Sequence, residues 1–346
     1  MYALCRWLRA RKFVLTDVIQ MVDEAAKCQA EAKAAGYYPD PEPALGCRAD
    51  IYQAQYPQIY SGVAKNGVPV FFSKTGVLNI GAVECITTVA NIVKYHWFVM
   101  IHDFAKRLRD HKAIDPKFTR FEAVTILDMA ELTVAQLNSR TMAIIKEQSA
   151  IDALCFPETM NKMFIINAPK FFTATWTIIK GWIDPRTANK VEVLGSRKTW
   201  EPKLLEYIDA DQLPSDYGGT GPNTQDTMEK EGFKGDLKRL HTELLSIRSS
   251  DSCTFNVMPG EELNVTVFTR STTGAKFTIV DAVGNKTHAY NVMVKHNSED
   301  TTKLPSNKSI TRENIKGPAR VKVKVESMGS RFVTSASNYL VVFSVY

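Results

Sequence analysis

The sequence predicts an α/β domain followed by a small all-β sandwich. Three buried strand-like runs, AVTILD, MFIIN and KVEVLG, alternate with helical patterns between residues 123 and 195, which is typical of a parallel or mixed sheet. Beyond residue 249, apolar residues recur at every second position in short runs separated by turn residues, as in a sandwich. The Gly- and Pro-rich segment LPSDYGGTGPNTQD lies between the two patterns and indicates a domain boundary.

The first half of the chain is predicted from its periodicities. Apolar residues at helical spacing indicate helices, and short β-branched runs beside Gly, Pro or Asn indicate strands. A proline-rich connector, YYPDPEPALG, separates the first helix from the rest. The expected elements are a helix over residues 16–35, two short strands within KNGVPVFFSKTGVLN (65–79), a helix over 82–110, a strand over 123–128, a helix over 133–154, and strands over 163–167 and 190–195.

The remaining elements complete the expected domain plan. Residues 227–247 form a polar, helix-like stretch, and six strand-like runs follow it: TFNV, LNVTVFT, KFTIVD, AYNVMV, ARVKVKVE and NYLVVFSVY. We therefore expect an N-terminal helical part at residues 1–40, an α/β domain at 45–222, a linker with a helix at 223–249, and a sandwich at 250–346.

The charge is concentrated in the last third of the chain. The net charge is +6, and residues 230–346 alone hold 17 Lys+Arg against 11 Asp+Glu. This bias suits an anionic membrane surface or an acidic protein partner, and it is well short of a nucleic-acid footprint. The run ARVKVKVE places Arg320, Lys322 and Lys324 on one strand face, which makes them a candidate contact for anionic lipid or for a protein.

The sequence contains no pattern that indicates an enzyme, a metal site or a cofactor. GxSxG, a GxGxxG after a strand, the P-loop and HExxH are absent, and the six histidines show no ligand spacing. The six cysteines are scattered without a CxxC, which favours a reducing compartment. We therefore expect no catalytic residues, no metal and no cofactor, and we interpret His96 and His102 as structural.

No membrane span or secretory signal is expected. The most apolar long stretch, residues 83–104, carries five ionisable side chains, and basic residues occupy the N-terminal region where a signal peptide would be apolar. These features predict a cytoplasmic protein that binds membranes peripherally, with import into an organelle left open.

The segment KFFTATWTIIKGWI at residues 170–183 is apolar round most of a helix. Such a helix is buried, faces lipid or closes an apolar pocket. Asp184 can cap a short helix after it, with Pro185 in the first position, so that Thr187 and Lys190 form a candidate phosphate site. One face of the apolar helix carries Phe172, Trp176, Ile179 and Ile183, and the neighbouring face carries Phe171, Ile178 and Trp182.

The order of several motifs resembles the CRAL-TRIO lipid-binding family, and in particular its phosphatidylinositol/phosphatidylcholine transfer proteins. The resemblance covers residues 1 to about 222 and implies N-terminal helices beside a mixed sheet that floors a hydrophobic pocket, closed by a gate helix at 170–183. The motifs that carry it are WLRARKF (7–13), NGVPVFFSKTGVLN (66–79), VTILDM (124–129), FPETMNKMFIINAPKFF (156–172), IDPRTANKVEVLG (183–195) and LPSDYGGT (213–220).

The resemblance also implies a set of ligand-binding residues. By motif match, the phosphoinositol headgroup would be held by Arg11, with Lys12 beside it, and by Glu158, Thr187 and Lys190. The family's serine-rich segment is MAELTVAQ here, which leaves Thr133 as a candidate for a second headgroup site. The helices that precede the RARKF motif in the family are missing, so we expect a truncated helical part, and the C-terminal β-region resembles a GOLD domain.

The expected function is non-enzymatic binding of one phospholipid, most readily phosphatidylinositol, and its transfer between membranes. Two alternatives remain open at this stage. The same fold could carry a sterol, tocopherol, retinoid or other isoprenoid, or the chain could be a structural or adaptor subunit of a membrane-associated complex, with a protein partner bound through the C-terminal β-domain.

Overall fold

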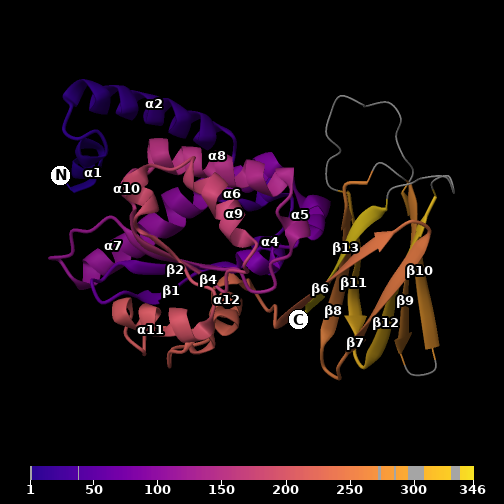
Figure 1. Ribbon diagram of the computed structural model, residues 1–346. Coiled ribbons are helices and arrows are strands. Elements are labelled where there is room, and N and C mark those ends of the chain that lie inside the picture. The colour runs from indigo at the N-terminus through magenta and orange to yellow at the C-terminus, as the bar shows by residue number, and fades with distance from the viewer. Residues whose placement is uncertain (1, 38, 272–273, 284–285, 295–307, 329–335) are drawn as a thin grey trace. The chain divides into compact units, whose positions relative to one another are not determined.

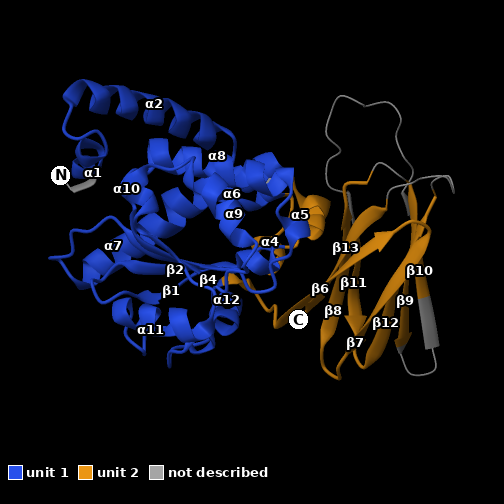
Figure 2. Cartoon of the chain, in the orientation of Figure 1, with its two compact units in different colours: residues 1–45, 56–78, 89–231 blue, residues 46–55, 79–88, 232–346 orange. Residues whose placement is uncertain are grey.

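The computed structural model describes residues 2–37, 39–271, 274–283, 286–294, 308–328 and 336–346 (Figure 1). The chain forms two compact units, coloured separately in Figure 2. Unit 1 contains residues 1–45, 56–78 and 89–231, and unit 2 contains residues 46–55, 79–88 and 232–346. The units are therefore not consecutive segments of the chain, because two short stretches of the first half belong to unit 2.

Unit 1 is built on a mixed five-stranded sheet in the order β1-β2-β3-β4-β5. The first pair is antiparallel and the other three pairs are parallel, which confirms the predicted mixed α/β architecture. The strands are β1 (Gln58–Val63), β2 (Pro69–Ser73), β3 (Ala123–Asp128), β4 (Met160–Ile166) and β5 (Val191–Val193).

Helices cover both faces of this sheet, with α6, α8 and α9 on one face and α11 on the other (Figure 1). The helices of unit 1 are α1 (Tyr2–Ala10), α2 (Leu15–Ala34), α3 (Glu42–Leu45), α6 (Val89–Phe98), a π-helical turn (Val99–Phe104), α7 (Ala105–Ile114), α8 (Ser139–Cys155), α9 (Phe172–Lys180), α10 (Pro185–Ala188), α11 (Arg197–Tyr207) and α12 (Thr224–Gly232).

A hydrogen-bond network ties the carboxyl ends of β3 and β4 to the segments that follow them. Asp128 accepts hydrogen bonds from Asn167 Nδ2 at 2.8 Å and from the Tyr217 hydroxyl at 2.9 Å. Asn167 in turn accepts one from Trp200 Nε1 at 2.9 Å. Burial raises the pKa of the Tyr217 hydroxyl far above its ordinary value, and the negative charge of Asp128 raises it further. This hydroxyl therefore keeps its proton and stays a donor.

Unit 2 is a sandwich of two antiparallel four-stranded sheets, in the orders β10-β9-β12-β7 and β11-β8-β13-β6. Its core is filled from both inner faces by alternate apolar side chains such as Val265, Val323 and Phe343, which are fully buried. The strands are β6 (Arg239–Ile247), β7 (Ser250–Val257), β8 (Glu262–Thr269), β9 (Ala275–Val283), β10 (Lys286–Val294), β11 (Lys308–Lys316), β12 (Ala319–Ser327) and β13 (Ser337–Val345).

Two short helices from the first half of the chain complete unit 2: α4 (Ala49–Gln55) and α5 (Ile80–Ile86). Gln55 at the end of α4 donates to Thr242 on β6 at 3.0 Å. Arg48, which precedes α4, donates to the Tyr346 hydroxyl at 3.0 Å and to Ser344 at 3.1 Å. These contacts join α4 to the sheet that contains β6 and β13.

Four predicted elements differ from the structure. Of the two strands expected within residues 65–79, only β2 forms, and Thr75–Val77 make a 3-10 turn after it. The helix expected over 82–110 is broken at Thr87, whose backbone is extended, because α5 packs in unit 2 and α6 in unit 1. The helix expected over 133–154 begins at Ser139, where Asn138 caps it. The helix expected over 227–247 was wrong in its second half, because residues 239–247 pair with β13 as strand β6.

Candidate ligand-binding site

Unit 1 encloses a cavity of about 550 Å³ between its sheet and the helices α6, α8 and α9. This volume lies within the usual range of small-molecule sites. All five strands supply side chains to its floor, and on β3 these are Ala123, Thr125 and Leu127, which are alternate residues on one face of the strand. Most of the lining is apolar, so the cavity suits a ligand with long hydrocarbon parts.

Helix α9 closes one side of the cavity with a single face. The residues that line the cavity are Phe172, Trp176, Ile179 and Ile183, which is the face that the sequence predicted. On the other face, Ile178 is 55% exposed and Phe171 is 37% exposed. The cavity therefore accounts for one apolar face of this segment, and the other apolar face is exposed.

Cationic side chains gather at the end of the cavity formed by α1, α10 and the start of β4. The lining contains Arg11, Arg186 and Lys190 together with the hydroxyl-bearing Thr187. Arg186 donates to the backbone oxygens of Arg9 at 3.4 Å and Ala10 at 3.3 Å, which ties α10 to the end of α1.

The local backbone explains how α10 presents these groups. Asp184 caps α10 by accepting a hydrogen bond from the Arg186 backbone N–H at 2.8 Å, with Pro185 in the first position, as predicted. A side-chain hydrogen bond from Arg186 holds the pKa of Asp184 below its usual range. The Lys190 backbone N–H then donates to the Thr187 carbonyl at 3.0 Å, which places the two side chains beside each other.

Glu158 is the acidic member of this end of the cavity. Its carboxylate lies 3.7 Å from Lys190 Nζ, and the same ammonium donates to the Met160 backbone oxygen at 2.8 Å. Glu158 adopts the left-handed backbone region with φ of 58°, directly after Pro157. Four residues that the family motifs indicated, Arg11, Glu158, Thr187 and Lys190, therefore line one cavity although they are distant in the sequence.

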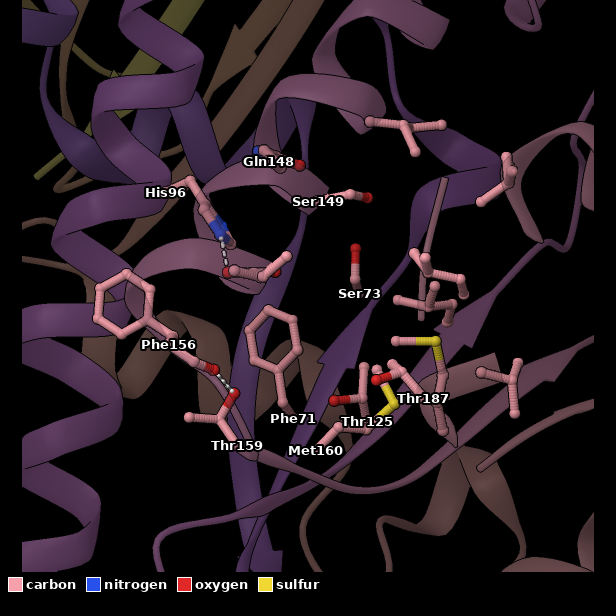
Figure 3. Close-up of a pocket in the computed structure, with 18 of the residues that line it drawn as sticks. Phe71, Ser73, His96, Thr125, Gln148, Ser149, Phe156, Thr159, Met160 and Thr187 are labelled. Carbon is pink, nitrogen blue, oxygen red and sulfur yellow. Dashed lines mark hydrogen bonds and ion pairs between the residues drawn. The ribbon is translucent and has the colours of Figure 1, made fainter. Parts of the chain in front are cut away.

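A second polar group lines the interior of the same cavity. His96 Nε2 lies 2.7 Å from an oxygen of Asp152 on α8, and both residues line the cavity. Burial raises the pKa of Tyr60, also in the lining, well above its ordinary value, so the phenol stays neutral. Figure 3 shows His96, Gln148, Ser149 and Ser73 around one part of the cavity, and Thr187 near Thr125 and Met160 in another.

Four predicted site residues do not line the cavity: Lys12, Thr133, Phe171 and Trp182. Lys12 is exposed in the turn after α1. Thr133 is exposed, and its hydroxyl donates to Gln136 Oε1 at 2.9 Å in a cap of the following turn. The neighbours Leu132 and Gln136 line the cavity, whereas Thr133 does not.

Sequence reasoning missed Arg186, His96 and Asp152. Arg186 stands within the motif IDPRTANK, so its position was visible, but its bonds to α1 depend on tertiary packing. His96 and Asp152 are 56 residues apart in the sequence, and no spacing rule brings them together. The helical period of α8 is the available signal, because Thr141, Ile145, Gln148 and Asp152 all fall on the face that lines the cavity.

The described residues contain neither a cluster of metal ligands nor a helix suited to cross a membrane. In that part of the chain, no group of three or more His, Cys, Asp or Glu side chains could hold a metal ion. Among the same residues, no helix has both the length and the apolar composition that a membrane crossing requires.

Comparison with known proteins places residues 53–219 under the CRAL/TRIO domain family. A phosphatidylinositol/phosphatidylcholine transfer protein of Arabidopsis thaliana is 29% identical over 221 residues, which are 63% of this chain and 37% of that protein. A CRAL-TRIO domain-containing protein of Saccharomyces cerevisiae is 30% identical over 225 residues, 63% of this chain and 70% of that protein. A SEC14 cytosolic factor of Candida glabrata is 27% identical over 223 residues, 62% of this chain and 69% of that protein.

The coverage differs between these relatives. The chain spans between 27% and 39% of the length of four Arabidopsis thaliana transfer proteins that it matches. It spans 70% of the Saccharomyces cerevisiae protein at 30% identity. With the family match over residues 53–219 and the predicted mixed sheet and helices in place, the chain belongs to the CRAL/TRIO domain family.

Proposed function

We propose that the chain binds one phospholipid molecule in the cavity of unit 1 and transfers it between membranes. The observation that carries the proposal is the cavity itself, which combines an apolar interior with Arg11, Glu158, Thr187 and Lys190 at one end. An amphiphile with a phosphorylated headgroup matches both parts. The names of the Arabidopsis thaliana relatives, which are transfer proteins for phosphatidylinositol and phosphatidylcholine, support this ligand class.

The headgroup that fits the polar end best is phosphoinositol. Arg11 and Lys190 supply positive charge for a phosphate, and a lysine ammonium has three donors, of which one reaches the Met160 carbonyl. Thr187 can donate to a phosphate oxygen, and the Glu158 carboxylate can accept from an inositol hydroxyl. Lys190 already lies 3.7 Å from the Glu158 carboxylate, so a phosphate would add its negative charge chiefly beside Arg11.

Transfer requires contact with a membrane and movement of α9. Each buried CH₂ group contributes about 0.8 kcal/mol, so release of two acyl chains into water is strongly disfavoured. The lipid therefore leaves only where a bilayer receives the chains. Helix α9 is the candidate gate, because Phe172, Trp176 and Ile179 on this helix line one side of the cavity.

The first experiment identifies the lipid that co-purifies with the protein. The protein is purified, extracted with organic solvent and analysed by mass spectrometry, as wild type, Thr187→Ala and Lys190→Ala. We expect phosphatidylinositol in the wild type and at least a tenfold lower content in both variants, because each removes a direct headgroup contact.

Matched controls are available on surfaces outside the cavity. Thr177 on α9 and Lys198 on α11 are exposed and do not line the cavity, so Thr177→Ala and Lys198→Ala should retain the lipid. An isoprenoid or sterol in the extract would overturn the phospholipid assignment and leave the fold unchanged. A native size far above 38.8 kDa in source material would instead favour the role of a subunit in a complex.

A further inference from the structure

The outer face of one sheet of unit 2 carries a row of cations. On β12, Arg320 and Lys322 are exposed and Lys324 is half-buried, while the alternate residues Val321 and Val323 are fully buried in the sandwich core. Strand β12 lies between β9 and β7 in its sheet. We call Arg320, Lys322 and Lys324 the basic strip.

The strand register shows what surrounds the basic strip. Arg320 is opposite Ala282 and Asn256, Lys322 is opposite Val280 and Thr254, and Lys324 is opposite Thr278 and Ser252. All six neighbours are uncharged and small. Directly opposed residues share one face of a sheet, so none of the cross-strand neighbours of the three cations is acidic.

Only the end of the strip is neutralised by the protein. Lys324 Nζ lies 2.8 Å from Glu326, and Lys276 on β9 is opposite Glu326 in the register. Within the described part of the chain, no ion pair joins Arg320 or Lys322 to a carboxylate. Alternate residues on a strand are about 7 Å apart, so these two like charges repel each other with no internal compensation.

The arrangement fits an extended anionic plane better than a single phosphate or a nucleic acid. A phosphate site needs donors that converge on one point, whereas these side chains stand in a row on a flat sheet. Single-stranded nucleic acids are bound with aromatic stacking, and none of the six cross-strand neighbours of the strip is aromatic. The small flanking side chains allow a broad surface to come close to the charges.

We propose that the basic strip of unit 2 is a docking surface for bilayers that contain acidic phospholipids. The concentration of the chain's net positive charge in residues 230–346 agrees with this role. The surface lies outside the cavity of unit 1, so it supplies attachment to a membrane and is independent of which lipid the cavity holds. Each basic residue near an anionic surface strengthens binding about fivefold, and binding of this kind weakens with salt.

The test is co-sedimentation of the full chain with vesicles of phosphatidylcholine alone or with 30% phosphatidylserine, a composition on the order of acidic inner leaflets. Wild type should bind only the acidic vesicles, and Arg320→Gln with Lys322→Gln should weaken that binding roughly 25-fold. The matched control is Arg248→Gln with Lys316→Gln, which removes the same two charge types from exposed positions elsewhere in unit 2. The control should bind as the wild type does.

Two outcomes would overturn the proposal. Equal loss in the test and control variants would assign the effect to net charge rather than to the strip. If the wild type does not bind acidic vesicles, the bilayer proposal is wrong, and an acidic protein becomes the candidate partner of this surface. The lipid extracted from the protein is measured in the same samples. An empty cavity in the wild type would show failure of the carrier function, whereas failure of the docking surface would appear only in the vesicle binding.

Discussion

Asp128 joins three segments that carry parts of the family resemblance. It stands at the end of VTILD, and it accepts hydrogen bonds from Asn167 at the end of MFIIN and from Tyr217 in the segment LPSDYGGT. These motif residues hold the scaffold together at one end of the sheet. Thr187 and Lys190, in another motif, line the cavity instead. Family motifs in this chain therefore contain both scaffold residues and residues that line the cavity.

Removal of Asp128 should cost more stability than removal of one of its partners. We expect Tyr217→Phe to lower the free energy of unfolding by about 1–2 kcal/mol, because one hydrogen bond to a charged group is lost. Asp128→Ala should cost about 3 kcal/mol, since it leaves several donors without an acceptor. Urea unfolding of both variants and of the exposed control Thr177→Ala checks this. Equal losses for the first two variants would contradict the central role of Asp128.

At the scale of the element, α9 has two apolar faces with different environments. Trp176 lines the cavity, whereas Ile178 is 55% exposed. Removing a side chain that contacts ligand and cavity wall affects both binding and packing. Removing an exposed one affects neither.

The two faces are compared by a pair of variants. Trp176→Ala should reduce the co-purifying lipid severalfold and lower the free energy of unfolding of the protein by about 2 kcal/mol, because it enlarges the cavity. Ile178→Ala should change stability by less than about 0.5 kcal/mol and leave the lipid content unchanged. Mass spectrometry and thermal unfolding of the same preparations give both readouts. A loss of lipid in Ile178→Ala equal to that in Trp176→Ala would show that the exposed face also matters for loading.

Elements with a strong local pattern were predicted from the sequence, and those decided by tertiary pairing were not. The buried run AVTILD forms β3 with the predicted bounds, because a continuous β-branched segment has no helical alternative of similar stability. The run RLHTELLSI was predicted as helix because it also contains helix-forming residues. It forms a strand because it pairs with β13, about 90 residues away in the sequence. Strands β1 and β11 were missed, and both lie at sheet edges where alternation is weak.

The candidate site shows the same division. Thr187 and Lys190, indicated by the Asp184 cap and the family motif, and the face of α9 indicated by helical spacing do line the cavity. The His96–Asp152 pair and the bonds of Arg186 to α1 could not be predicted, because they join segments that meet only in the fold. Thr133 does not line the cavity, whereas its neighbour Leu132 does, and local sequence patterns do not decide which of the two faces inward.

At the scale of the whole molecule, unit 2 takes in two helices from the first half of the chain, α5 within the CRAL/TRIO region and α4 at its start. Ile51 on α4 is 4% exposed and Ile86 on α5 is fully buried, although the sandwich strands begin only at Arg239. A protein divided at the sequence boundary would separate these helices from the sheet that Gln55 and Arg48 contact.

A chain that ends at residue 231 should therefore be unstable. We expect it to bind a hydrophobic dye and to unfold at a lower temperature than the full chain, because the apolar sides of α4 and α5 lose their partners. Ile51→Ser with Ile86→Ser should reduce dye binding in the shortened chain and lower the stability of the full chain by about 3 kcal/mol or more. Unchanged melting and no dye binding in the shortened chain would contradict this account.

Unit 2 combines helices from the first half of the chain with strands from the last third, so its parts are synthesised at different times. Helices α4 and α5 leave the ribosome early, whereas β13, which pairs with both β6 and β8, ends at Val345. At about 5–20 residues per second, some 15–60 seconds pass between the emergence of α4 and that of β13. During this interval Ile51 and Ile86 have no native partner sheet, which makes the nascent chain a natural client for chaperones that cover apolar segments.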